Sequence, residues 1–168
     1  DSMRSVIHLL GILLSFLLGS TLSGFLLHGS TLKLGRHYDT ALLLESVLLL
    51  STLWLLSIGS FYGHFFASAA CGLQNALATT YSGAVIRTTH VTGLFTDLGI
   101  MIGEFFRGKA LDKRKAKLFL VIIIGFIFGG TLGALLYAEI QFMALLVPAS
   151  ICAFIAVVYR LYYNHRRQ

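Results

Sequence analysis

Polar side chains gather in one stretch of an otherwise apolar chain, residues 71–99, whose sequence is CGLQNALATTYSGAVIRTTHVTGLFTDLG. This stretch stands out because the chain of 168 residues is 57% hydrophobic and only 12% charged. Polar groups are expensive inside a bilayer, so those that a membrane protein keeps there are candidates for a substrate or ion pathway. The candidate pathway residues are Gln74, Asn75, Arg87, Thr89, His90, Thr92, Gly93, Thr96 and Asp97.

Asp97 is the candidate with the strongest chemical character. On a helix, Gly93, Thr96 and Asp97 fall at positions i, i+3 and i+4 and share one face. A carboxylate in this position would be costly in a membrane if it had no partner. We expect either that Arg87 or His90 neutralises Asp97, or that its carboxyl group gains and loses a proton as part of a relay.

The other candidate side chains also have purely structural interpretations. Gln74 and Asn75 can join neighbouring helices through hydrogen bonds, which contribute about 0.6 kcal/mol on average in a membrane. Arg87 can extend to the lipid headgroups, Thr88 or Thr89 can cap the helix that follows, and His90 can bond to a backbone carbonyl. The residue types and their spacing therefore leave both binding and packing open.

Several kinds of site are not expected in this chain. Cys71 and Cys152 lie far apart in apolar segments and lack the spacing of a zinc site, so we expect no metal and no cofactor. The chain has no GxSxG motif, no HExxH motif and no pair of carboxylates at catalytic spacing, so we do not expect an enzyme. The net charge of +6 comes without a basic polar domain, which favours the lipid bilayer over nucleic acid as a partner.

The elements that must position the candidates are membrane-spanning helices, each of which needs about 20 mostly apolar residues. Five ranges meet this requirement, and a sixth, 91–106, is shorter and polar. The five ranges are 6–27, 41–59, 61–79, 118–138 and 142–162. The sequence therefore predicts an all-α, polytopic transmembrane helical bundle of about six segments, with a tight hairpin between the second and the third.

Basic residues indicate the orientation of such a bundle, because loops rich in Lys and Arg stay in the cytoplasm. If 91–106 crosses the membrane, ten of the 13 basic residues fall on the side that holds both chain ends, and three on the other. If 91–106 is re-entrant, 12 fall on the side of the C-terminus and only Arg4 on the other. Both arrangements place the C-terminus in the cytoplasm. We favour the full crossing because 16 helical residues extend about 24 Å, and we expect Glu45 and Glu104 near the membrane surface.

Two apolar segments resemble each other. Residues 15–27 read SFLLGSTLSGFLL and residues 125–137 read GFIFGGTLGALLY, with five identities at an offset of 110. Duplicated helical units are a feature of transporter folds. Gly125, Gly129 and Gly133 also have the GxxxG spacing that lets helix backbones approach closely, which predicts a helix-packing face.

The duplication predicts how the chain is organised. We expect a single transmembrane domain, 1–168, in which 1–60 form the end of a first repeat and 61–168 form a second repeat. The first repeat then lacks a counterpart of the polar helix pair at 61–106. We therefore expect an N-terminal helix pair to be absent from this chain.

The segment GLQNALATTYSGAVIRTTHVTGLFTDLG resembles the signature of the YoaK family of bacterial membrane proteins, DUF1275. Members are similar in carrying a GLQNA segment followed by RTTHVTG and TDLG, and all three elements are uninterrupted here. The resemblance implies an integral protein of the bacterial inner membrane. It also implies an additional N-terminal helix pair, and the family has no established activity.

Two functions fit these observations. The first is a small-molecule transporter or permease, with a small molecule or an ion as substrate and the polar segments as its site. The second is a non-catalytic structural or assembly subunit of a larger membrane protein complex. In that case helix faces lined with small residues would bind a second copy of the chain or another membrane protein.

Overall fold

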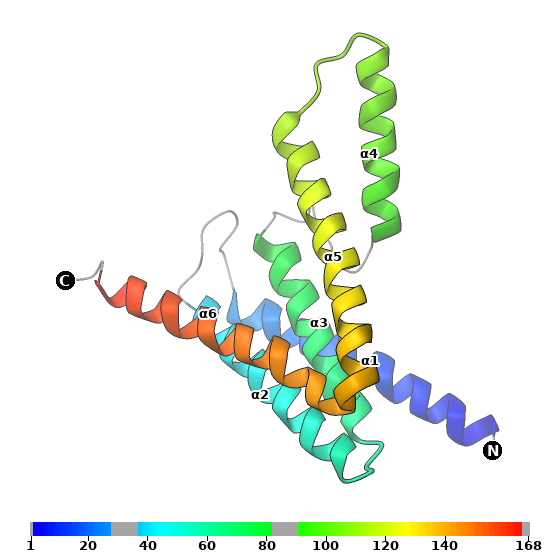
Figure 1. Ribbon diagram of the computed structural model, residues 1–168, viewed down its shortest axis with the longest axis vertical. Coiled ribbons are helices and arrows are strands. Elements are labelled where there is room, and N and C mark those ends of the chain that lie inside the picture. Colours follow the sequence, from blue (N-terminus) through cyan, green and yellow to red (C-terminus); the bar gives the residue numbers. More distant parts are fainter. Residues whose placement is uncertain (1, 28–36, 82–90, 166–168) are drawn as a thin grey trace.

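Long apolar runs with few interruptions form helices in the part of the chain that this computed structural model describes, residues 2–27, 37–81 and 91–165. No strand occurs in these ranges. The helices are α1 (Ser2–Leu26), α2 (Tyr38–Ser57), α3 (Gly63–Tyr81), α4 (Val91–Phe106), α5 (Lys113–Ile140), the short 3-10 helix η1 (Gln141–Leu145) and α6 (Leu146–His165). Each of the six predicted segments overlaps one α-helix (Figure 1). The all-α class is therefore confirmed.

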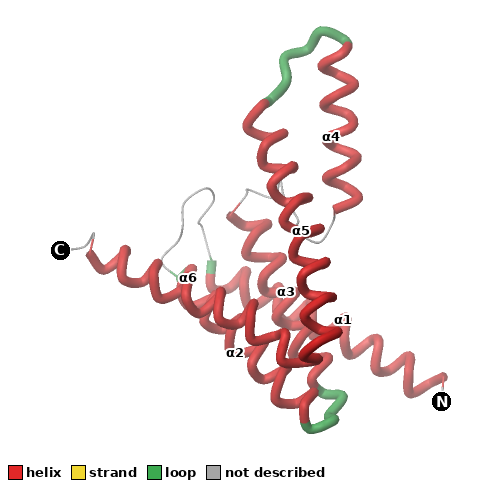
Figure 2. The backbone as a smooth tube through the Cα atoms, in the orientation of Figure 1, coloured by secondary structure: helices red, strands yellow, loops and turns green. Residues whose placement is uncertain are grey.

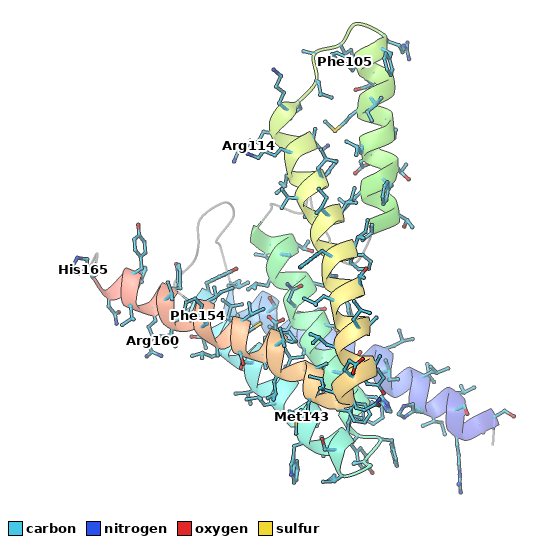
Figure 3. All side chains as sticks on the ribbon, in the orientation of Figure 1. Phe105, Arg114, Met143, Phe154, Arg160 and His165 are labelled. Atoms are coloured by element: carbon cyan, nitrogen blue, oxygen red, sulfur yellow. The ribbon has the colours of Figure 1, made fainter. Side chains whose placement is uncertain are left out.

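Within the described residues, three helical stretches are long and apolar enough to cross a membrane. They are Ser2–Leu26, Tyr38–Ser57 and Lys113–His165, the last of which joins α5 to α6. Many of their large apolar side chains point outward, and Phe154 on α6, labelled in Figure 3, is 70% exposed. Outward apolar side chains at this density suit contact with lipid. The crossing of the membrane by six segments stays a prediction.

Four helices form a packed group in which α1 lies along α3, and α2 lies against both α3 and α6 (Figure 1). A cluster of buried apolar side chains holds the group together, because burying them removes them from contact with solvent and fills the space between helices. The cluster consists of Leu27, Ala41, Leu42, Leu73, Leu77 and Ala156.

The backbones of α1 and α3 touch directly. A Cβ atom added at Gly19 would lie 2.0 Å from the carbonyl oxygen of Ala69, and one added at Gly72 would lie 2.1 Å from that of Phe16. The Ser20 hydroxyl crosses the same contact and donates a hydrogen bond of 3.0 Å to the Gly72 carbonyl. Small residues permit this approach, which is how transmembrane helices gain packing energy without a hydrophobic driving force.

The helices α2 and α6 run antiparallel. Near the start of α2, Asp39 lies 4.0 Å from Arg160 near the end of α6. Further along, the Ser46 hydroxyl donates a hydrogen bond of 2.9 Å to the carbonyl of Ala149, close to the start of α6. If both helices cross a membrane, the end of α6 therefore lies on the same side as the start of α2.

The predicted hairpin between the second and third segments is confirmed. Helix α2 ends at Ser57 and α3 begins at Gly63, and the two helices pack against each other. Gly59 adopts a φ of +75°, which residues with a side chain rarely adopt, and this lets the chain reverse within a few residues.

A second hairpin, formed by α4 and α5, stands away from the four-helix group (Figure 2). Its core contains Leu94 from α4 with Phe119 and Ile123 from α5. The Asp112 carboxylate caps α5 by accepting a hydrogen bond of 3.0 Å from the backbone N–H of Lys115. Beyond this hairpin α5 continues into η1, and η1 contacts α2 and α6.

The glycine face predicted on α5 has no partner among the described residues. A Cβ atom added at Gly125, Gly129 or Gly133 would meet nothing within 4 Å. The reason is that α5 contacts only α4 and η1 in the described ranges, and its glycines point away from both. Gly19 and Gly129, which are equivalent in the predicted repeat, therefore have different surroundings.

Candidate functional site

The two α3 candidates lie in the second half of that helix. Gln74 is exposed and Asn75 is half-buried. Each of them takes part in an interaction, so neither amide is free. The Asn75 carbonyl also accepts a hydrogen bond of 2.7 Å from the Thr79 hydroxyl one turn later. This hydrogen bond stays within α3 and uses the backbone of Asn75, not its side chain.

The α4 candidates form a continuous polar face, here called the α4 polar face. Thr92, Gly93, Thr96 and Asp97 are all exposed, and the Thr96 hydroxyl donates a hydrogen bond of 3.0 Å to the carbonyl of Thr92. Leu94, on the other side of the helix, is buried against α5. Because a helix repeats every 3.6 residues, packing Leu94 against α5 turns this polar face outward.

The structure does not bring the α3 and α4 candidates together. In the described ranges α4 contacts α5 alone and has no contact with α3. Arg87, Thr89 and His90 lie outside the described residues, so the expected pairing of Asp97 with Arg87 or His90 stays a prediction.

Glu104 and Glu45 differ in their exposure. Glu104 lies at the end of α4 and pairs with Lys109 at 2.6 Å, in agreement with an interfacial position. Glu45 is only 6% exposed, so unlike Glu104 it is enclosed by protein, and both α3 and α6 pack against α2. Its position near the membrane surface stays a prediction.

The surroundings of Glu45 are almost entirely apolar. The thiol of Cys152 on α6 forms a hydrogen bond with its carboxyl group. The other carboxyl oxygen, Oε2, is buried and has no hydrogen-bond partner among the described residues, and the same holds for the hydroxyl of Ser23 on α1. Sequence reasoning missed this residue, although a single Glu within the run ALLLESVLLL was a signal that could have found it.

Aromatic side chains mark both ends of α2. At its start, the rings of Tyr38 and Tyr159 lie 5.5 Å apart between their centres. Beyond its end, His8 contacts both Phe61, at 5.9 Å, and His64, at 5.4 Å. Tyrosine and other amphipathic rings are enriched where a helix passes from hydrocarbon to headgroups. Tyr38 and Tyr159 at the start of α2 suit such a position.

Apolar helices of spanning length, outward apolar side chains and aromatic ends are together consistent with a helical membrane protein. The model of one family, described as a protein of unknown function (DUF1275), matches residues 1–158. The chain therefore belongs to the DUF1275 family, as its GLQNA and RTTHVTG segments indicated. No curated protein and no solved structure matches it.

Proposed function

We propose that the protein is a small-molecule transporter or permease of the bacterial inner membrane. The observation that carries this proposal is the α4 polar face, which α5 leaves uncovered. The carboxyl group of Asp97 would be costly against lipid, so in the membrane it needs water, a solute or another polar surface beside it. A water-filled pathway supplies both water and a solute.

Within this pathway the candidates have different tasks. Asp97 supplies a carboxyl group that can bind a cationic group of a solute or exchange a proton. Gly93 keeps the helix surface open beside it, since no atom would meet a side chain there. Gln74 and Asn75 on α3 are further polar candidates for this pathway, and Arg87, Thr89 and His90, which lie outside the described residues, stay candidates from the sequence alone.

Uptake by purified protein in lipid vesicles tests the proposal. Radiolabelled amino acids, monosaccharides, nucleobases and monocarboxylates would be offered to vesicles with and without a pH gradient. We expect at least one class to enter faster than into protein-free vesicles. Equal rates for every class, with correctly folded protein, would contradict a permease.

We further propose that the C-terminus lies in the cytoplasm and the start of α1 on the opposite side. The contact of α2 with α6, through Asp39 and Arg160, supports this arrangement because it is antiparallel. If α2, α3 and α6 all cross the membrane, an antiparallel α6 requires an odd number of crossings between the end of α3 and the start of α6. In this arrangement α5 crosses and α4 (Val91–Phe106) is re-entrant, which replaces the full crossing that the length of α4 favoured. This re-entrant alternative leaves Arg4 as the single basic residue outside, which fits the positive-inside rule.

Labelling of introduced cysteines distinguishes the two orientations. With Cys71 and Cys152 replaced by serine, Ser2→Cys is expected to react with a membrane-impermeant maleimide in intact cells. His165→Cys is expected to react only after the membrane is permeabilised. If both positions require permeabilisation, the full crossing of α4 is the correct arrangement instead.

A structural or assembly subunit of a larger membrane complex is the second candidate function. The open glycine face of Gly125, Gly129 and Gly133 favours it, because close helix packing in membranes uses such faces. After gentle solubilisation, a subunit is expected to remain with a partner protein or a second copy. A monodisperse particle that contains one chain alone would rule out this candidate.

A further inference from the structure

Glu45 is the one carboxyl group among the buried residues of the described chain. The other buried polar residues are Ser23, Ser46 and Thr52, which carry hydroxyl groups. Glu45 lies about 10 Å along α2 from Tyr38, since each helical residue adds 1.5 Å. It is therefore placed well inside the four-helix group and not at its end.

No cation faces this carboxyl group in the described ranges. The titratable groups near it are the thiols of Cys152 on α6 and Cys71 on α3. On α1, His8 is directed to the far end of the group, where it contacts Phe61, and η1 has no titratable residue. The nearest cationic side chain of α6, Arg160, is paired with Asp39.

The surroundings decide which form of the acid is stable. An ionised carboxylate without water or a cation has a large desolvation penalty, whereas a neutral carboxylic acid needs only hydrogen bonds. Cys152 supplies one such bond, and the unpartnered Oε2 is the atom where a proton can be held. Uptake of a proton at Oε2 would remove the charge and, with it, the largest part of this penalty.

We propose that Glu45 is a proton-binding site of the four-helix group. A hydronium ion in water that reaches the site transfers its proton to Oε2, which forms the O–H bond of a neutral acid and leaves a water molecule. The reverse transfer releases the proton when the packing of α6 on α2 opens. The inference rests on the proposed permease in one respect, namely that movement of this proton would drive movement of the solute. Binding of the proton by Glu45 is a separate property.

Infrared difference spectroscopy of the protein in lipid tests proton binding without any substrate. The chain has three glutamates, so the double variant Glu104→Gln with Glu139→Gln keeps Glu45 alone. Carboxyl-labelled glutamate then shifts the absorption of Glu45 away from that of every aspartate. We expect a protonated carboxyl band at acidic pH that decreases reversibly as the pH rises.

Two outcomes would overturn the proposal. A band absent at every pH would mean a permanently ionised group, and a band of constant size would mean an acid that is protonated for structural reasons only. Cys152→Ala removes the hydrogen bond to Glu45 and is expected to change the pH at which the carboxyl band decreases. Cys152→Ser is expected to keep this pH near the wild-type value. A titrating Glu45 in a protein that transports none of the solutes would contradict the permease and leave the proton site intact.

Discussion

Replacing Gly19 with alanine is expected to lower the free energy of unfolding by about 3 kcal/mol or more, the upper end of the cost of overpacking a core. The new Cβ would lie 2.0 Å from the carbonyl oxygen of Ala69, and this oxygen belongs to the backbone of α3 and cannot turn aside. The two helices would have to separate, which also breaks the hydrogen bond from Ser20 to Gly72. Unfolding in mixed SDS micelles, followed by circular dichroism, measures the change.

Gly24→Ala is the matched control because it lies on the same helix and a Cβ there meets nothing within 4 Å. Its stability is expected to stay at the wild-type value or to rise slightly, since alanine favours helix over glycine. Equal loss of stability in both variants would show that the direct contact of α1 with α3 does not stabilise the fold.

Replacing Asp97 with asparagine is expected to lower solute uptake at least about tenfold, which corresponds to 1.4 kcal/mol. Asparagine keeps the size and hydrogen-bonding capacity of the side chain but can neither carry charge nor exchange a proton. Asp97 is exposed on the α4 polar face and does not hold the core, so the variant is expected to fold normally. The initial rate of uptake into vesicles measures the effect.

Glu104→Gln is the control for charge on the same helix. Glu104 lies two turns beyond Asp97 on the same side of α4, at the end of the helix, where it pairs with Lys109. Its replacement is expected to leave uptake within about twofold of wild type, because surface ion pairs contribute about 0–1 kcal/mol. Normal uptake by Asp97→Asn would show that the carboxyl group of Asp97 is not part of the pathway. Equal loss in both variants would indicate a general effect of charge on α4.

The helices could be predicted from the sequence because apolar runs of spanning length allow few other structures in a membrane. Which helices pack together could not, and the glycines show why. Gly19 and Gly129 occupy equivalent positions of the predicted repeat, yet Gly19 contacts α3 and Gly129 is open. Spacing predicts a surface that can pack closely, whereas the partner depends on how the whole chain is arranged.

The candidate site was predictable to a similar degree. The polar face of α4 followed from the spacing of Thr92, Thr96 and Asp97, because helix periodicity alone decides which side chains share a face. Burial of Glu45 did not follow, since it depends on α6, which is about a hundred residues later in the sequence and covers α2 through contacts such as Ser46 with Ala149. Long-range contacts of this kind leave no local pattern.

The most direct test of a solute pathway is the access of water to α4. In a background with Cys71 and Cys152 replaced by serine, single cysteines would be placed at Thr96 and Asp97, on the α4 polar face, and at Phe95 and Ile102, on its exposed apolar side. A membrane-impermeant thiol reagent is expected to modify the first pair rapidly and the second pair slowly. Equal reaction at all four positions would mean that α4 lies in bulk water, and no reaction at the first pair would mean a covered face; either result would contradict a pathway along α4.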